Sequence, residues 1–286
     1  MQVFDATQNS LGEGVLWHPL RSSLFWFDIL KHRLFERNLD DQNAKVWQFD
    51  AHVSAAGWID FNTLMIASET ELFAFNLEDE TKNTLAPLEA DNPITRSNDG
   101  RADRQGGFWI GTMGKRAEDK AGSIYRYYKG ELRKLFGDLT ITNSICFAID
   151  GSVAYFTDTF TRQIMSVRLD QDGWPISEPK IYLDLNAAKL SPDGAVIDAR
   201  GNMWIAQWGA GRVSCYDQTG KLITAQHATA QQITCPAFGG DDYQTLFCTS
   251  ASEGLGDVDI KTQNAGATYF IKLDDFKGVP EPQVFI

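Results

Sequence analysis

Three side chains with oxygen donors, Glu13, Asn143 and Asp193, stand in short polar segments that each lead into a hydrophobic run. Two carboxylates and one amide oxygen around a single point suit a hard divalent cation such as Ca²⁺ or Mg²⁺, and the same donors also accept Zn²⁺ or Mn²⁺. Three protein ligands leave coordination positions for water and a substrate, which a catalytic metal needs. This chemistry requires a fold that brings three distant segments to one place.

The elements that carry these residues repeat along the chain. Short β-prone runs recur at intervals of 39 to 49 residues, and each is preceded and followed by another β-prone run. Such spacing is typical of four-stranded propeller blades, whereas helical repeats would show a 3.6-residue periodicity that is missing here. The anchors of the six runs are Trp26, Met65, Trp109, Tyr155, Trp204 and Phe247. We predict an all-β fold in which residues 1–286 form one domain, a six-bladed β-propeller with four-stranded antiparallel blades.

The outer strand of the last blade can come from either end of the chain. Residues 3–4 stand before Glu13 much as residues 181–182 stand before Asp193, which favours the N-terminus as the closing strand. Residues 283–286 are the second candidate for the same place. Either arrangement closes the ring and protects a sheet edge that would otherwise be exposed.

The order of strands in an antiparallel blade places the three oxygen-bearing residues at one end of the ring. The segment that leads into the innermost strand lies at the same end as the loop between the second and third strands. We therefore expect Glu13, Asn143 and Asp193 to converge on the axis. The longer connections 113–122 and 251–266 belong to this end too, where long loops often cover sites. Each residue alone also fits an ordinary turn or strand end, so a structural role remains the alternative.

Three other residues are sorted by the same rule. Asp150 and Asp198 fall near the hairpins at the opposite end, and we predict that they are turn residues. Trp208 follows the second strand of the fifth unit and so belongs to the same end as Asp193. Its ring could anchor a loop or pack against a sugar.

Composition excludes several classes of function. The net charge of −12 argues against nucleic acid and anionic membrane surfaces as partners. No apolar run approaches the ~20 residues that span a bilayer, and the first residues do not resemble a signal peptide, so we expect a cytoplasmic protein. The four histidines are scattered and the four cysteines lack metal-site spacing, so the metal should have oxygen ligands and the thiols should stay reduced. A serine hydrolase is not favoured, because no Gly-x-Ser-x-Gly motif occurs.

Six fragments occur in order across nearly the whole chain: LGEG at 11–14, RSNDG at 96–100, WIGTM at 109–113, YFTDT at 155–159, SPDG at 191–194 and FGG at 238–240. Together they resemble the SMP-30/gluconolactonase family, which includes regucalcin and bacterial sugar lactonases. The resemblance implies one divalent metal held by Glu13, Asn143 and Asp193, with Asp193 also acting as general base and acid. It further implies that Arg96 and Asn98 contact the hydroxyls and ring oxygen of a sugar (aldono) lactone, which is hydrolysed to the aldonic acid.

Two departures from the family pattern concern the site. Several members have glycine after the metal-binding asparagine, where this chain has Ser144, and regucalcin-like members have an acidic residue where this chain has Lys115 and Arg116. The second departure indicates a substrate preference different from that of regucalcin, either for a differently placed hydroxyl group or for a more anionic ligand.

The resemblance leaves two other functions open, a non-catalytic calcium-binding propeller and a promiscuous ester or organophosphate hydrolase. A structural ion should be fully enclosed by protein ligands, whereas the promiscuous hydrolase should have a more apolar pocket without Arg96 and Asn98. The lactone, its ring size and the metal stay open, and a monomer is the default.

Overall fold

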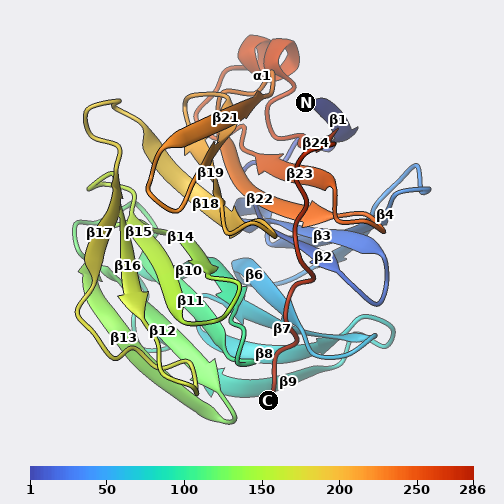
Figure 1. Ribbon diagram of the computed structural model, residues 1–286. Helices are drawn as coiled ribbons and strands as arrows, with labels where there is room; N and C mark the ends of the chain where they lie inside the picture. The colour runs from blue at the N-terminus through green and yellow to red at the C-terminus, as the bar shows by residue number, and fades with distance from the viewer.

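The computed structural model describes residues 1–286 as six four-stranded antiparallel sheets arranged around a central axis (Figure 1). Each sheet is one blade, and the innermost strands of neighbouring blades contact one another around the ring. The predicted all-β, six-bladed β-propeller is therefore confirmed.

The strands follow chain order from the axis outward in five blades, and the sixth blade takes its outer strand from the N-terminus. The blades are, in order, β2 (Gly12–His18), β3 (Ser23–Asp28), β4 (Arg33–Asn38) and β5 (Lys45–Gln48); β6 (Val53–Trp58), β7 (Thr63–Ser68), β8 (Glu71–Asn76) and β9 (Lys82–Pro87); β10 (Thr95–Ala102), β11 (Phe108–Gly114), β12 (Gly122–Tyr128) and β13 (Glu131–Leu139); β14 (Thr142–Phe147), β15 (Val153–Asp158), β16 (Gln163–Arg168) and β17 (Lys180–Asp184); β18 (Ser191–Ile197), β19 (Met203–Trp208), β20 (Arg212–Tyr216) and β21 (Leu222–His227); β22 (Ile233–Gly239), β23 (Thr245–Ser250), β24 (Thr268–Lys272) and β1 (Gln2–Asp5).

The hydrophobic core lies between the blades. All six residues of β3 are buried, whereas only one of the four residues of the outer strand β5 is buried. A second strand such as β3 is covered on both faces by neighbouring blades, which explains its run of successive large apolar residues. Stacked rings join adjacent blades, as between Phe136 and Phe156 and between Trp17 and Phe247. All four cysteines are buried and unpaired.

The N-terminus closes the ring. Strand β1 pairs antiparallel with β24, with Gln2 opposite Phe270 and Val3 opposite Tyr269. The C-terminal candidate lies elsewhere: the main-chain N–H of Val284 donates to the carbonyl of Trp58 at 2.9 Å. Of the two arrangements that the sequence left open, the N-terminal one is therefore correct.

The C-terminal segment instead crosses the hairpin end of the ring (Figure 1). The N–H of Phe285 donates to the carbonyl of Gly106, in the hairpin between β10 and β11, at 2.8 Å. The carboxylate of Glu281, in the same segment, forms an ion pair with Arg101 of the innermost strand β10, and the two side chains are only 8% and 9% exposed. The segment thus closes the channel at the hairpin end.

The buried ion pair gives a stability prediction. Replacing Glu281 by alanine leaves the guanidinium of Arg101 buried without its carboxylate, so we expect the free energy of unfolding to fall by about 3–5 kcal/mol. The matched control is Glu131→Ala, because Glu131 pairs with Arg133 on the surface with both side chains half exposed, and such pairs contribute about 0–1 kcal/mol. Urea unfolding curves compare the two variants, and equal losses would contradict the prediction.

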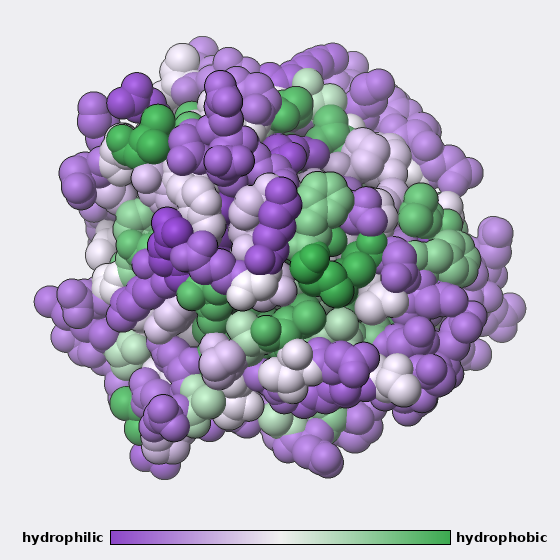
Figure 2. Space-filling view, turned by 90° about the horizontal axis from the view of Figure 1, so that it is seen from below, coloured by the Kyte–Doolittle hydropathy of each residue, from purple (hydrophilic) through white to green (hydrophobic).

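The one α-helix, α1 (Asp257–Gln263), lies in the connection between β23 and β24 and was not predicted. No helix is long and apolar enough to cross a membrane. Seen from below, the surface is mainly hydrophilic, with hydrophobic residues gathered near the middle of the view (Figure 2).

Candidate functional site

A cavity of about 770 Å³ lies at the end of the ring where the chain leads into the innermost strands. All five residues singled out in the sequence line it, namely Glu13, Arg96, Asn98, Asn143 and Asp193. The remaining lining residues are Leu11, Leu30, Met113, Lys115, Arg116, Ala117, Ile141, Thr159, Phe160, Arg162, Ser191, Trp208 and Glu253. The structure therefore brings together residues from blades 1, 3, 4 and 5, at the end that strand order predicted.

An irregularity in strand pairing occurs in each innermost strand at the level of the cavity. One strand has an extra residue there, which bends the backbone and redirects side chains. In blades 1 and 4 the shift begins at Glu13 and Asn143; in blades 3 and 5 it begins at Ser97 and Pro192, directly before Asn98 and Asp193. These bulges account for polar residues facing the axis from strands that otherwise pack hydrophobic side chains between blades.

The residue after Glu13 and the residue after Asn143 both have left-handed backbone conformations, with φ of 56° at Gly14 and at Ser144. A Cβ atom at Gly14 would lie 2.1 Å from the carbonyl oxygen of Ser54, so only glycine fits there. At Ser144 the side chain is accommodated, and its Oγ donates a hydrogen bond to the carbonyl of Asp193. The departure from the family pattern at this position thus preserves the turn and adds a link between two site segments.

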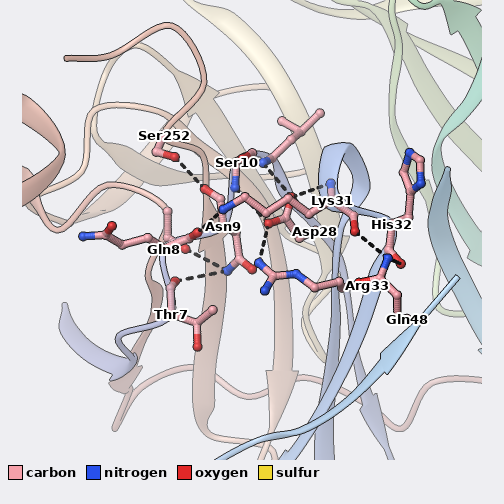
Figure 3. A network of polar contacts seen from close by, with 12 residues as sticks. Thr7, Gln8, Asn9, Ser10, Asp28, Lys31, His32, Arg33, Gln48 and Ser252 are labelled. Atoms are coloured by element: carbon pink, nitrogen blue, oxygen red, sulfur yellow. Dashed lines mark hydrogen bonds and ion pairs between the residues drawn. The ribbon is translucent and has the colours of Figure 1, made fainter. Parts of the chain in front are cut away.

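Two buried aspartates hold the segments that precede Glu13 and Asn143. Asp28, at the end of β3, accepts hydrogen bonds from the N–H groups of Ser10 and Leu11 at 2.9 and 3.2 Å and pairs with Arg33 (Figure 3). Asp158, at the end of β15, accepts from the N–H groups of Thr140 and Ile141 at 2.9 and 3.0 Å. The repeated arrangement fixes both segments before they reach the axis. This role was not predicted from the sequence, although Asp28 and Asp158 each end the hydrophobic run of their blade's second strand.

Hydrogen bonds orient the amide of Asn143. Its Nδ2 donates to Thr159 Oγ1 at 2.9 Å, and its Oδ1 accepts from Asn98 Nδ2 at 3.0 Å. Asn98 is held in turn by Arg96, whose guanidinium donates to Asn98 Oδ1 at 2.7 Å. The oxygen of Asn143 therefore keeps a fixed place, with a second lone pair available to a ligand.

The carboxyl groups of Glu13 and Asp193 are buried, line the same cavity and influence each other's pKa. Burial, followed by the charge of Asp99, raises the pKa of Glu13 to about 8. Burial, followed by the charge of Glu13, raises the pKa of Asp193 well above its usual range. A divalent cation bound between them would lower both pKa values, because an opposite charge favours the ionised carboxylates.

The donor set fits a hard divalent cation. Glu13 and Asp193 line one cavity and offer carboxylate oxygens, the donors that hard divalent cations prefer. Asn143, on the wall of the same cavity, adds an amide oxygen. Asp99 is engaged below the cavity, where its Oδ2 accepts from the N–H of Ile145 at 2.7 Å, and its pKa is raised to about 6 by burial.

The raised pKa of Glu13 gives a pH prediction for the metal-free protein. Between the ordinary value of 4.5 and the folded value of about 8, the folded chain binds more protons than the unfolded chain, so the free energy of unfolding should fall as the pH rises through this window. Urea unfolding in the presence of EDTA at pH 5 to 8 measures the slope. A saturating divalent cation should flatten this slope, and Glu13→Gln should reduce it, with the remainder coming from the raised pKa values of Asp193 and Asp99. A free energy of unfolding that rises with pH would contradict the prediction.

Several lining residues were not found from sequence. Phe160 and Arg162 follow β15 in a tight turn, and Glu253 follows β23. Phe160 is 73% exposed, and nothing in its local pattern distinguishes it from a surface residue. Trp208, for which two roles stayed open, lines the cavity and is partly packed against the core of blades 1 and 2. Asp150 and Asp198 lie in hairpins at the opposite end, where each accepts main-chain N–H bonds as predicted for turn residues.

Comparison with known proteins agrees with this architecture. Residues 11–252 match the family described as SMP-30/Gluconolactonase/LRE-like region. A protein of Rhizobium meliloti (strain 1021) named as a sugar lactone lactonase is 37% identical over 96% of this chain and 93% of its own, and regucalcin of Sus scrofa is 28% identical over 94% and 93%. The crystal structure of a calcium-binding protein, regucalcin, from Agrobacterium tumefaciens str. C58 superposes with a TM-score of 0.97 at 39% identity, covering 100% of this chain and 97% of the other. The chain therefore belongs to the SMP-30/gluconolactonase/LRE-like family.

Proposed function

We propose that the protein is a lactonase that hydrolyses a sugar (aldono) lactone to the aldonic acid with the help of one divalent cation. The observation that carries this proposal is that Glu13, Asn143 and Asp193 line the same cavity as Arg96 and Asn98. The similarity to proteins named as sugar lactone lactonases supports lactone hydrolysis. The metal ligands and the role of each residue are part of the proposal.

In this proposal Glu13, Asn143 and Asp193 hold the cation. When bound, a divalent cation supplies Lewis-acid polarisation of the lactone carbonyl and stabilises negative charge on its oxygen. Asp193 accepts a proton from the attacking water, whose oxygen forms a bond to the carbonyl carbon. The bond between that carbon and the ring oxygen then breaks, and Asp193 returns the proton to the ring oxygen. Arg96 and Asn98 hold hydroxyl groups so that one face of the ring meets the water.

Two features favour a catalyst over the alternatives. A purely structural ion should be enclosed by protein, whereas Glu13 and Asp193 line a cavity large enough for a sugar. A promiscuous ester or organophosphate hydrolase should lack polar groups for hydroxyls, whereas Arg96 and Asn98 line the cavity here and are hydrogen-bonded to each other.

The test is a hydrolysis screen of 1,4- and 1,5-aldonolactones with Ca²⁺, Mg²⁺, Mn²⁺ or Zn²⁺ added to EDTA-treated protein. We expect hydrolysis above the spontaneous rate with at least one pair of lactone and cation, and return to the spontaneous rate in EDTA. Hydrolysis that persists in EDTA, after bound metal has been shown to be absent, would exclude the metal-dependent mechanism. No hydrolysis of any lactone would refute the proposed function.

A further inference from the structure

The walls of the cavity carry opposite charges. Glu13, Asp193 and Glu253 come from blades 1, 5 and 6 and form an acidic side. The cationic lining residues all come from the neighbouring blades 3 and 4, namely Arg96, Lys115, Arg116 and Arg162. In a chain with a net charge of −12, four cations on one wall of one cavity are a local reversal of the overall charge.

Most of these charges are balanced by neighbours. The carboxylates of Glu13 and Asp193 together match the charge of a divalent cation. Lys115 forms an ion pair with Glu69, and its Nζ also donates to a main-chain carbonyl at 3.1 Å. The buried guanidinium of Arg96 is stabilised by the negative charges of Glu13, Glu253 and Asp193. These groups leave no surplus of charge.

Arg116 and Arg162 are not balanced in this way. Neither guanidinium has a carboxylate oxygen within 4.0 Å or a hydrogen bond to the protein. The partly exposed carboxylate of Glu118 accepts the main-chain N–H of Arg116 at 3.0 Å, and this hydrogen bond, followed by weaker effects that include the charge of Arg116, lowers the pKa of Glu118, but the carboxylate forms no ion pair with the guanidinium. Two guanidinium groups, each with several free N–H donors, therefore face the same cavity.

The main chains that carry these arginines are held in place. Arg162 lies in the turn between β15 and β16, with φ of 57°; its N–H donates to Thr159 at 3.2 Å, and its carbonyl accepts from Leu185 at 2.9 Å. Arg116 lies in the connection between β11 and β12, where Ala117 N–H donates to Gly114 at 2.8 Å. Both connections stand at the end of the ring where Asn143 and Asp193 lie. A guanidinium fork matches carboxylate, sulfonate and phosphate oxygens in a bidentate manner.

We infer that Arg116 and Arg162 form an anion subsite, and that the preferred substrate is a sugar lactone with a second, negatively charged oxyanion group remote from the lactone carbonyl. This inference rests on the proposed lactonase function. The lactone end lies toward Glu13, Asn143 and Asp193, and the oxyanion lies against the wall formed by blades 3 and 4. A carboxylate and a phosphate ester share the required chemistry, and matched substrates distinguish them.

The test compares lactones that differ only in the charged group. D-Glucaro-1,4-lactone differs from D-glucono-1,4-lactone by a carboxylate in place of the terminal hydroxymethyl group, and 6-phospho-D-glucono-1,5-lactone differs from D-glucono-1,5-lactone by a phosphate. We expect kcat/KM to be at least about tenfold higher for the charged member of one pair, mainly through KM, and to fall toward the neutral value as NaCl is raised. Equal values within both pairs would overturn the inference.

Variants assign the effect to the two arginines. Arg116→Gln and Arg162→Gln should each lower kcat/KM for the charged lactone by about tenfold and change the neutral lactone by less than about twofold. Arg168→Gln is the matched control, because Arg168 is an exposed arginine of the same blade as Arg162, lies outside the cavity and has no ion pair. Equal losses on charged and neutral lactones in the two cavity variants would contradict the subsite.

A binding measurement separates this inference from the lactonase proposal. Calorimetry with D-glucarate, 6-phospho-D-gluconate and D-gluconate, the ring-opened forms, measures the preference for the extra charge without catalysis. Tighter binding of D-glucarate or 6-phospho-D-gluconate than of D-gluconate, lost in Arg116→Gln and Arg162→Gln, supports the subsite even if no lactone is hydrolysed. Equal binding of all three acids overturns it even if the protein proves to be an active lactonase.

Discussion

Replacing Asp193 by asparagine is expected to lower kcat for lactone hydrolysis by about 10³-fold or more. General acid–base catalysis by one side chain contributes about 10²–10⁴-fold, and an amide can neither accept the proton of water nor return it to the ring oxygen. The amide keeps an oxygen that can face the cation. The effect should therefore appear in kcat more than in metal content.

The fold should tolerate this change. The neighbouring contact of Ser144 uses the main-chain carbonyl of Asp193 and not its carboxylate. The substitution also removes a carboxylate that lies against Glu13, so the metal-free variant should unfold at a urea concentration equal to or higher than the parent protein.

The measurement is kcat at saturating lactone, with bound metal determined on the same sample. Asp150→Asn is the control, because Asp150 is a carboxylate at the opposite end of the ring whose bonds are confined to its own hairpin, and its kcat should stay within about twofold of the parent value. Parental rates in a metal-loaded Asp193→Asn protein would exclude Asp193 as the base.

The propeller was predictable because each blade repeats a pattern that depends on local chemistry. The second strands are buried on both faces and so consist of consecutive apolar residues, as in β3 and β7. The outer strands β13 and β21 have no buried residue and therefore no long run of consecutive apolar side chains, so the sequence marks them only weakly. Strand order alone then sufficed to place Glu13, Asn143 and Asp193 at one end of the axis.

Other parts of the molecule depend on contacts that no local pattern records. The helix α1 has no buried residue, so no hydrophobic periodicity marks it. The C-terminal segment is held partly by the main-chain carbonyls of Trp58 and Gly106, which leave no trace in side-chain types, and partly by the ion pair of Glu281 with Arg101, two residues 180 positions apart in the chain. Arg162 enters the cavity from a turn with positive φ, a conformation that arginine itself does not indicate.

Strand order also predicted which residues form the candidate site, but not how their side chains are oriented. Equivalent positions in different blades identified the residues, but the bulges that orient them and the aspartates that hold their segments became visible only in three dimensions. Asp28 and Asp158 occupy the same place in blades 1 and 4. A comparison of blades at the ends of their second strands, and not only at the starts of their first strands, would have found them.

Replacing Glu13 by glutamine is expected to weaken divalent-cation affinity by about 100-fold. Loss of residues that merely orient metal ligands already costs about 10–100-fold, and Glu13 would supply one of only two carboxylates to the ion. The substitution preserves the shape of the side chain, and Gly14 N–H can still donate to an oxygen of the glutamine amide, as it does to Glu13 at 3.1 Å.

Linkage between binding and folding makes this change measurable without activity. At a cation concentration 100 times its Kd, the ion stabilises the folded protein by about 2.7 kcal/mol, and after a 100-fold loss of affinity the same concentration contributes only about 0.4 kcal/mol. Urea unfolding with and without the cation therefore separates the parent protein from the variant. Glu253→Gln is the matched control: Glu253 is a carboxylate in the same cavity but is exposed, so its loss should leave most of the stabilisation intact. An unchanged metal titration in Glu13→Gln would show that Glu13 is not a metal ligand. In that case no cation would offset the burial of the Glu13 carboxylate, and its raised pKa would lower the stability of the folded protein with or without metal.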